Sequence, residues 1–141
     1  MENAKSVNSS RTTITELMIP SYANFGGKIH GGILLSLMDK VAYACAAKHA
    51  GTYVVTVSVD NVEFKKPVEV GELVSLHASV NYVGRSSLII GIRVIAENIK
   101  SQEVLIRLKF DCSRIDSAYG TTKNHSGRMV SFILRNQIMK N

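Results

Sequence analysis

Apolar residues recur at two different spacings along this chain, and the change of spacing separates a helix from a set of strands. From about Gly31 to Ala50 they recur every three or four residues, which is the period of an α-helix. The apolar positions of this segment are Leu34, Leu37, Met38, Val41 and Cys45, with Ile33, Ala44 and Ala47 beside them. A helix of this length is about 30 Å long. Because it is apolar around most of its circumference, we expect it to be buried on several sides and to end at Gly51.

Alternating apolar and polar residues predict strands on both sides of this helix. One strand is expected at Arg11–Ile19, after a polar lead at residues 1–10 that should fray. Four more are expected at Tyr53–Phe64, Leu73–Tyr82, Leu88–Glu97 and Glu103–Ser113. This order predicts an α+β domain, in which a mostly antiparallel sheet of about five strands wraps around one long central helix. The first strand must rejoin the sheet after the helix.

The C-terminal residues differ from the rest of the chain, and we interpret them as an extension of a single domain. The domain is expected at residues 1–116 and the extension at 117–141. Ser117–Gly127 is polar and contains glycine, which indicates a loop. Met129–Met139 either forms a short amphipathic helix or stays disordered until it finds a partner. The apolar face of such a helix would consist of Val130, Ile133 and Leu134.

The charge of the chain is concentrated in this extension. From residue 114 onward the chain has five basic residues and one acidic residue, Asp116, which gives this part a net charge of +4. The net charge of the whole chain is +6, so the rest carries only +2. A body so weakly charged argues against a nucleic-acid-binding face on the main fold. No apolar run approaches the roughly 18 residues that a membrane helix needs, so we expect no membrane insertion.

The cysteines and the first residues of the chain indicate a cytoplasmic location. Cys45 and Cys112 lie in apolar patterns and fit neither a disulfide framework nor a zinc spacing, so both are interpreted as buried thiols in a reducing compartment. Because this spacing is absent, we expect no metal site in the chain. The polar start, Met-Glu-Asn-Ala-Lys-Ser, lacks the apolar region of a secretory signal.

The segment from Asn24 to Asp39 carries the strongest indications of a functional site. Four glycines lie within the seven residues from Gly26 to Gly32, directly before the helix. Glycines at this position let a ligand approach the unpaired N–H groups of the first helical turn. Asp39 places a carboxylate inside an apolar pattern, which is costly unless the charge is used or paired. The structural alternative for Asp39 is a solvated helix residue or an ion pair with Lys40 or Lys65. The structural alternative for Asn24 is a simple turn residue.

The same residues resemble the acyl-coenzyme A thioesterases of the hotdog fold, in particular the short single-domain bacterial type. Their motif is Asn-x-x-Gly-x-x-x-Gly-Gly-x-x-Leu-x-x-x-Asp, and here it consists of Asn24, Gly27, Gly31, Gly32, Leu35 and Asp39. The flanking matches are Met18-Ile19-Pro20, Val-Thr-Val-x-Val at 55–59, Phe64-x-x-Pro67, Gly71 and Gly84-Arg85-x-Ser87. The resemblance covers roughly residues 12–113. It departs at His30, where an aromatic Phe is usual in the family.

The resemblance implies a sheet curled around one helix, and a homodimer that is often assembled into a hexamer as a trimer of dimers. It implies hydrolysis of acyl-CoA without a cofactor, since CoA is part of the substrate. Asp39 would act as general base or as attacking carboxylate, and Asn24 would position water or polarise the carbonyl. The Gly32 N–H would bind the oxyanion. In the family, the Asn and the Asp of one site come from different subunits.

Further residues are candidates for substrate contacts. Thr56 and Ser58 are expected on the same side of the strand that follows the helix. The phosphates of CoA are negatively charged and need cationic side chains nearby. The substrate-binding candidates are His30, Gly31, Thr56, Ser58, Lys65, Lys66, Gly84, Arg85 and Ser86. The alternative functions are a non-catalytic acyl-CoA-binding sensor or assembly module, and hydration of an enoyl thioester, which usually pairs a His with the Asp.

Overall fold

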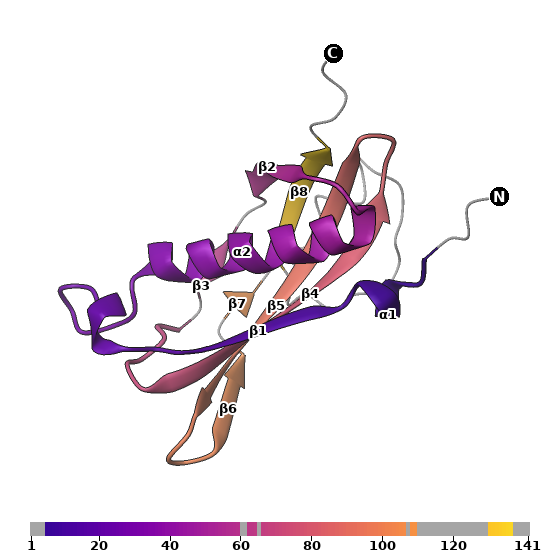
Figure 1. Cartoon of the computed structure of the whole chain (residues 1–141). Helices are drawn as coiled ribbons and strands as arrows, with labels where there is room; N and C mark the ends of the chain where they lie inside the picture. Colours follow the sequence, from indigo (N-terminus) through magenta and orange to yellow (C-terminus); the bar gives the residue numbers. More distant parts are fainter. Residues whose placement is uncertain (1–4, 60–61, 65, 107, 110–129, 137–141) are drawn as a thin grey trace.

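The computed structural model describes residues 5–59, 62–64, 66–106, 108–109 and 130–136 (Figure 1). Its helices are α1 (Val7–Ser10), the 3₁₀ turn η1 (Pro20–Tyr22) and α2 (Gly31–Ala50). Its strands are β1 (Thr12–Leu17), β2 (Val54–Val59), β3 (Glu63–Phe64), β4 (Glu72–Val83), β5 (Ser87–Asn98), β6 (Glu103–Ile106), β7 (Leu108–Lys109) and β8 (Val130–Asn136).

The main sheet has the order β1-β4-β5-β8-β2, and its strands pair in antiparallel fashion. β1 joins the sheet beside β4, although the whole of α2 lies between them in the sequence. The second edge of β5 is shared, because β8 pairs with Ser87–Ile92 and β6 pairs with Ile95–Asn98. This arrangement confirms the predicted α+β hotdog fold, an antiparallel sheet with one long helix against it.

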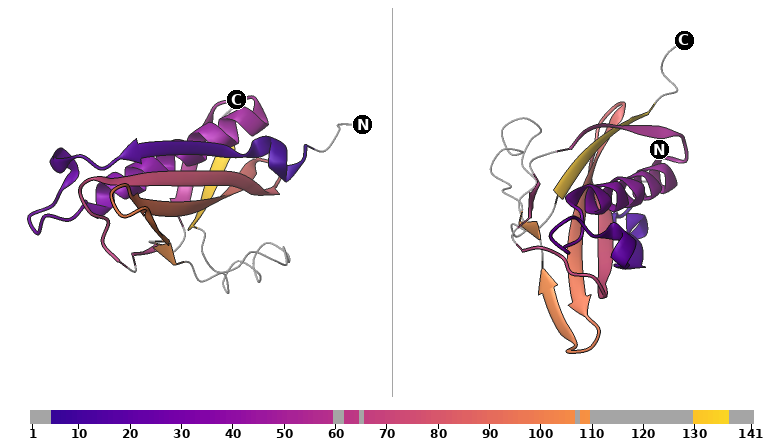
Figure 2. Two further views of the ribbon diagram at one scale, coloured as in Figure 1. Left: turned by 90° about the horizontal axis from the view of Figure 1, so that it is seen from below. Right: turned by 90° about the vertical axis from the view of Figure 1, so that its left-hand side faces the viewer.

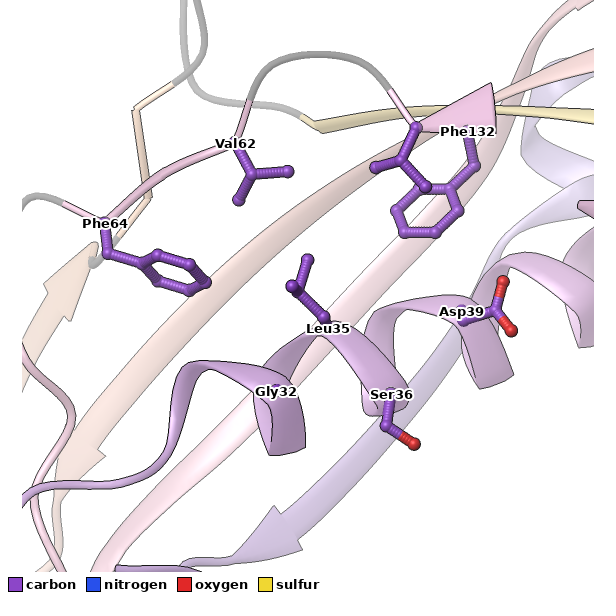
Figure 3. A pocket seen from close by; sticks show the side chains of 8 residues that line it. Gly32, Leu35, Ser36, Asp39, Val62, Phe64 and Phe132 are labelled. Carbon is purple, nitrogen blue, oxygen red and sulfur yellow. The ribbon is translucent and has the colours of Figure 1, made fainter. Parts of the chain in front are cut away.

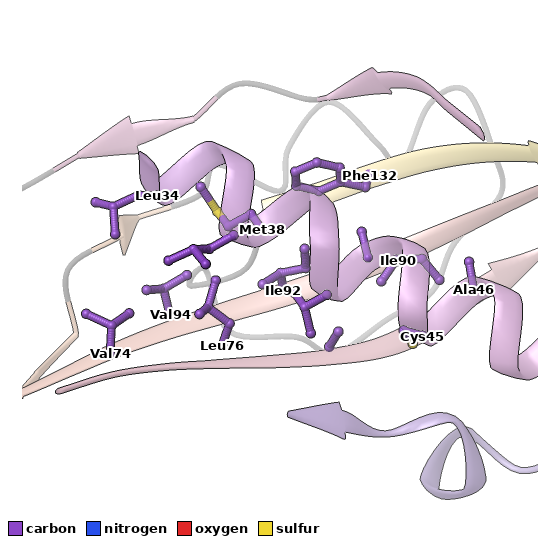
Figure 4. Close-up of a cluster of buried hydrophobic side chains, with 14 of the residues drawn as sticks. Leu34, Met38, Cys45, Ala46, Val74, Leu76, Ile90, Ile92, Val94 and Phe132 are labelled. Carbon is purple, nitrogen blue, oxygen red and sulfur yellow. The ribbon is translucent and has the colours of Figure 1, made fainter. Parts of the chain in front are cut away.

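Helix α2 lies against one face of the sheet (Figures 1 and 2). Its buried residues are Leu34, Leu37, Met38, Val41, Ala42, Cys45 and Ala46. They meet the inward-facing residues of β4, β5 and β8, among them Val74, Leu76, Ile90, Ile92, Val94 and Phe132 (Figure 4). The helix ends at Gly51 as predicted, because this residue takes a left-handed conformation with φ of 69° that favours glycine.

The helix predicted at Met129–Met139 is wrong for residues 130–136, which form strand β8. Phe132 and Leu134 are at most 1% exposed, whereas Ile133 between them is only partly buried. This alternation is that of a strand with one face on the core. The local sequence pattern did not distinguish a helix from a strand. A strand forms here because pairing with both β5 and β2 provides hydrogen bonds for its backbone N–H and C=O groups. The expected boundary between residues 116 and 117 lies outside the described residues, although β8 places part of the extension in the sheet.

Other segments also differ from the prediction. Tyr53–Phe64 contains two strands in different sheets, because β2 pairs with β8 while β3 pairs with β7. In the described part of Glu103–Ser113, β6 pairs with β5 in the main sheet and β7 pairs with β3 in the second sheet, so these residues do not form one strand. A strand that continued beyond β6 would pair with the first half of β5, but β8 occupies that position. Residues 7–10 form α1 instead of fraying, since the buried Ser10 hydroxyl accepts a hydrogen bond from the Val80 N–H at 3.0 Å.

Replacing Phe132 by Ala tests whether β8 is part of the core. We expect Phe132→Ala to lower the free energy of unfolding by about 3–5 kcal/mol, the usual cost of removing a buried Phe ring. Ile133→Ala should cost less than half as much, because that side chain is only partly buried. Urea unfolding of both variants at one protein concentration measures the difference. A larger loss for Ile133→Ala would support the amphipathic helix instead.

Candidate functional site

An open cavity of about 550 Å³ lies between the first half of α2 and the strands β2, β3 and β8. Its lining residues are Gly32, Leu35, Ser36, Asp39, Val59, Val62, Phe64 and Phe132 (Figure 3). Phe64 lies nearer Gly32 and Phe132 nearer Asp39, with Leu35 between them. An apolar wall with a few polar groups is typical of a small-molecule site. We call this the α2 cavity.

Most of the apolar wall was not identified from the sequence. Leu35 and Ser36 lie four and three residues before Asp39, so the helical face that they share with Asp39 was readable from spacing. Phe64 appeared only as part of the family motif. Phe132 comes from the C-terminal segment that was interpreted as an extension, so no local signal connected it to this site.

Asp39 lies on the exposed side of α2, and a hydroxyl group holds its carboxylate. The Thr56 hydroxyl, from β2, donates a hydrogen bond to Asp39 Oδ1 at 2.5 Å. No described lysine forms an ion pair with Asp39, whereas Lys28 and Glu69 do pair with each other. Lys65 lies outside the described residues. A hydroxyl orients a carboxylate without supplying a counter-charge, so the contact with Thr56 positions the Asp39 side chain beside the apolar cavity.

A bulge in β2 decides which of its residues reach this cavity. The pairing register with β8 shifts between Thr56 and Ser58. Such an irregularity interrupts the alternation of side chains along a strand. Thr56 therefore contacts Asp39 while Val59 lines the cavity, and Ser58 is not among the lining residues. The expectation that Thr56 and Ser58 serve the same site rested on uninterrupted alternation, and the lining residues do not support it for Ser58.

The first turn of α2 borders the cavity at its other end. Gly32 lines the cavity, and a Cβ atom on Gly31 would lie 3.7 Å from the Phe64 ring. His30 is the N-cap residue of the helix, and its Nδ1 accepts a hydrogen bond from the Gly32 N–H at 3.1 Å. His30 thus contacts the amide that was predicted to bind the oxyanion.

Asn24 organises the loop that precedes the helix. Its Oδ1 accepts hydrogen bonds from the N–H groups of Gly26 at 2.9 Å and Lys28 at 3.2 Å. Asn24 is exposed and is not among the residues that line the α2 cavity. Since the oxygen serves the loop, the NH₂ group is the part of this side chain suited to donate to a ligand carbonyl. Phe25, at the neighbouring position, is fully exposed.

Contacts on both sides hold this loop in place. The Tyr22 hydroxyl donates to Glu16 Oε1 on β1 at 2.6 Å, and the Tyr22 carbonyl accepts from the His30 N–H at 2.8 Å. The Ile29 N–H donates to the Val68 carbonyl at 2.9 Å. The hydrogen bond to Glu16 raises the pKa of Tyr22, because it favours the neutral phenol beside a carboxylate.

The predicted phosphate contacts lie apart from the cavity within one chain. Gly84, Arg85 and Ser86 form the turn between β4 and β5, at the end of the sheet near the C-terminal end of α2 (Figure 1). Gly32 lies at the opposite end of that helix. Lys66 is exposed after β3, and Lys65 lies outside the described residues. The structure therefore does not bring Arg85 to the α2 cavity of its own chain.

The described residues also bear on metals, membranes and thiols. They contain no group of three or more His, Cys, Asp or Glu side chains placed to hold a metal ion. None of the helices in this part of the chain is long and apolar enough to cross a membrane. Cys45 is buried as predicted, and burial raises the pKa of its thiol. Cys112 lies outside the described residues.

Comparisons with known proteins agree with the fold. The model of the thioesterase superfamily matches residues 26–102, which include Gly32, Asp39 and Thr56. Protein VdlD of Helicobacter pylori is 45% identical over 95 residues, 67% of this chain and 55% of that protein. YkhA of Bacillus subtilis, an uncharacterized acyl-CoA thioester hydrolase, is 34% identical over 94 residues, 67% of this chain and 55% of that protein.

A solved structure is similar over a larger part of the chain. An apo-hexameric acyl-CoA thioesterase superposes with a TM-score of 0.77 at 29% identity, over 94% of this chain and 72% of that chain. By contrast, the chain spans about half the length of VdlD and YkhA, the curated relatives described above.

The contact between Tyr22 and Glu16 predicts a shift in an alkaline titration. Replacing Glu16 by Gln removes the carboxylate that favours the neutral phenol, so we expect Tyr22 to ionise at lower pH than in the unchanged chain. Tyrosinate absorbance measures the titration, and Tyr22→Phe identifies the contribution of this residue. Glu97→Gln, which changes the net charge equally, is the control. Equal titrations of the two Glu variants would contradict the contact.

Proposed function

Because this chain belongs to the thioesterase superfamily, we propose that it hydrolyses acyl-CoA to a carboxylic acid and free CoA. The observation that carries the proposal is the Asp39 carboxylate, oriented by Thr56 at the wall of an apolar cavity that also contains Gly32. The apolar wall suits an acyl chain. The carboxylate suits the activation of water or direct attack at the thioester carbon.

Asp39 has two possible roles, and both use the same position. As a general base it takes a proton from water, and the water oxygen attacks the thioester carbonyl carbon. The C–S bond then breaks, and the CoA sulfur leaves with its electron pair and takes up a proton. As a nucleophile, Asp39 instead forms a mixed anhydride with release of CoA, and water then hydrolyses the anhydride. Neither route uses a cofactor.

Gly32 and Asn24 supply the hydrogen-bond donors in this proposal. The Gly32 N–H lies in the first turn of α2, where the helix dipole favours negative charge on a bound oxygen. It is therefore suited to the oxyanion that forms on the thioester carbonyl. The Asn24 NH₂ group would polarise the same carbonyl or orient water, since its oxygen is engaged by the loop.

We propose that the active form is a dimer in which Asn24 of one subunit completes the site of the other. Two features of the chain support this. Asn24 does not line the cavity of its own chain, and the neighbouring Phe25 is a fully exposed aromatic side chain. β2 is at an edge of the sheet and exposes Val57 and Val59 by 50% and 42%, so pairing with a second copy would bury apolar surface.

Higher assembly and contacts with CoA belong to the same proposal. The similar solved thioesterase is described as hexameric, which supports a trimer of dimers. Because Arg85 and its turn lie away from Gly32 of the same chain, any contact between them and the CoA phosphates would come from a neighbouring subunit. Lys65 and Lys66 remain candidates for the same contacts. The cytoplasmic location stays a prediction.

A panel of acyl-CoAs tests the proposed activity through release of the CoA thiol. We expect turnover of at least one chain length, and a loss of about 10²–10⁴-fold in kcat for Asp39→Asn, the usual contribution of an acid–base group. Thr56→Val should lower kcat less, because it removes only the orienting hydroxyl. Lys40→Ala, next to Asp39, is the control. Full activity of Asp39→Asn would contradict the mechanism, and tight binding without turnover would favour the sensor.

Mixed oligomers test whether subunits share the site. Asn24→Ala and Asp39→Asn should each be inactive alone. Co-expressed in equal amounts, they should recover about one quarter of the activity, because half of the dimers are mixed and each mixed dimer keeps one intact site of two. Thiol release per subunit is the measurement. No recovery, with mixed dimers demonstrated by two affinity tags, would place both residues of a site in one chain.

A further inference from the structure

The side chain of His30 occupies the hydrogen-bond donor on which the proposed reaction depends. Its Nδ1 accepts from the Gly32 N–H at 3.1 Å. A backbone amide carries one hydrogen, so it cannot give a good hydrogen bond to the ring and to a substrate oxygen at the same time. Gly32 also lines the α2 cavity, so this hydrogen bond lies at the wall of the site.

We propose that His30 competes with the carbonyl oxygen of the substrate for the Gly32 N–H and thereby sets the affinity of the site. The inference rests on the proposed function. In the ligand-free chain the ring accepts the hydrogen bond, and when an acyl thioester binds the ring is displaced by the thioester oxygen. His30 is accordingly a residue that tunes substrate affinity, and it takes no part in proton transfer.

The surroundings of His30 allow its ring to move without opening the helix. The His30 N–H donates to the Tyr22 carbonyl at 2.8 Å, and its carbonyl accepts from the Ile33 N–H at 3.0 Å. These bonds hold the backbone of the residue from both sides and do not involve the ring. The side chain itself is exposed. Rotation about χ1 therefore exchanges one acceptor for another at the Gly32 N–H and leaves the first helical turn in place.

The absence of a side chain at position 32 makes the contact possible. A Cβ atom on Gly32 would lie 3.2 Å from His30 Nδ1, which is tighter than ordinary packing, and 3.5 Å from His30 Cε1, which is an ordinary contact. Gly32 thus brings its amide close both to the ring and to the cavity. The aromatic Phe that is usual at position 30 in the resembling family has no ring nitrogen to accept this hydrogen bond.

The competition affects binding and not the chemical step. The hydrogen bond to His30 is broken equally in the substrate complex and in the transition state, because in both of them Gly32 donates to the substrate oxygen. Such a cost raises KM and leaves kcat unchanged. A His that carried a proton would instead lower kcat when replaced, so the two roles differ in a measurable quantity.

Steady-state kinetics of variants at position 30 test the proposal. His30→Phe and His30→Ala both remove the acceptor, and we expect KM to fall by about two- to thirty-fold in each, the range that corresponds to losing a helix cap, with kcat unchanged. His30→Asn keeps a capping oxygen and should keep the KM of the unchanged chain. A lower kcat in His30→Phe and His30→Ala, or an unchanged KM in both, overturns the proposal.

A matched control separates this competition from loss of helix stability. Gly51→Ala destabilises the same helix at its far end, because φ of Gly51 is 69°. We expect Gly51→Ala and His30→Ala both to lower Tm, but only His30→Ala to lower KM. A fall in KM for Gly51→Ala would show that a looser helix, and not a released amide, improves binding.

Two CoA analogues test the inference without turnover. An S-alkyl-CoA thioether has no carbonyl oxygen, whereas the analogue with a ketone in place of the thioester keeps one. Calorimetry should show that His30→Phe binds the ketone more tightly than the unchanged chain does. The two proteins should bind the thioether with equal affinity. Equal effects on both analogues overturn the inference. Absence of hydrolysis by the unchanged chain would refute the proposed function alone, since the difference between the analogues is still measured.

The hydrogen bond itself has a spectroscopic readout. The amide signal of Gly32 in a ¹⁵N–¹H spectrum should shift strongly in His30→Ala and less in His30→Asn, because the amide loses its acceptor only in the first variant. The amide signal of Gly51 at the far end of the helix should stay in place in both. An unshifted Gly32 signal in His30→Ala would refute the contact.

Discussion

The burial of α2 is the constraint on which the rest of this structure depends. The helix is apolar around most of its circumference, and the hydrogen-bonded strands of the sheet remove this apolar surface from water. Met38 and Val41 are completely buried against the sheet, which fixes the rotation of the helix about its axis. That rotation leaves Leu35, Ser36 and Asp39 on the side of the cavity. The position of the carboxylate is therefore a consequence of how the helix packs.

The site is assembled from elements that are remote in the sequence. α2 contributes Asp39 and Gly32, β2 contributes Thr56, and β8 contributes Phe132. The loop before α2 uses its polar groups internally, with Asn24 bound to the backbone of its own turn and His30 bound to the Gly32 N–H. One chain thus brings Asp39, Thr56 and Gly32 together, and in the proposed dimer a second copy would add Asn24.

The match to the superfamily model includes all but one of the residues that line the cavity. The superfamily model matches residues 26–102, whereas Phe132 lies beyond them in β8. One apolar wall of the cavity thus comes from a segment for which the sequence suggested no family counterpart. The wall near Asp39 is thus completed by a residue from outside the matched part of the chain. Under the proposed function, the range of acyl groups that fit would depend on β8 as well as on the motif.

The sequence by itself determined the elements whose pattern is local and strong. The period of the apolar residues located α2 with its end at Gly51, and alternation located β1, β4 and β5. The spacing from Asn24 to Asp39 identified the segment that borders the cavity. These features depend on the side chains of one contiguous stretch, which a periodic pattern records directly.

Only the tertiary structure decided which segments meet. The segment at 130–136 became a strand because β5 and β2 had edges to pair, and the bulge in β2 brought Thr56 to Asp39 while Val59 took the place expected for Ser58. The tertiary structure also decided the position of Arg85, whose turn lies at the far end of α2 from Gly32. Pairing and packing between remote segments depend on which edges and faces are open after the rest has folded. A pattern within one stretch carries no information about that, for the physical reason that its own residues do not make those contacts.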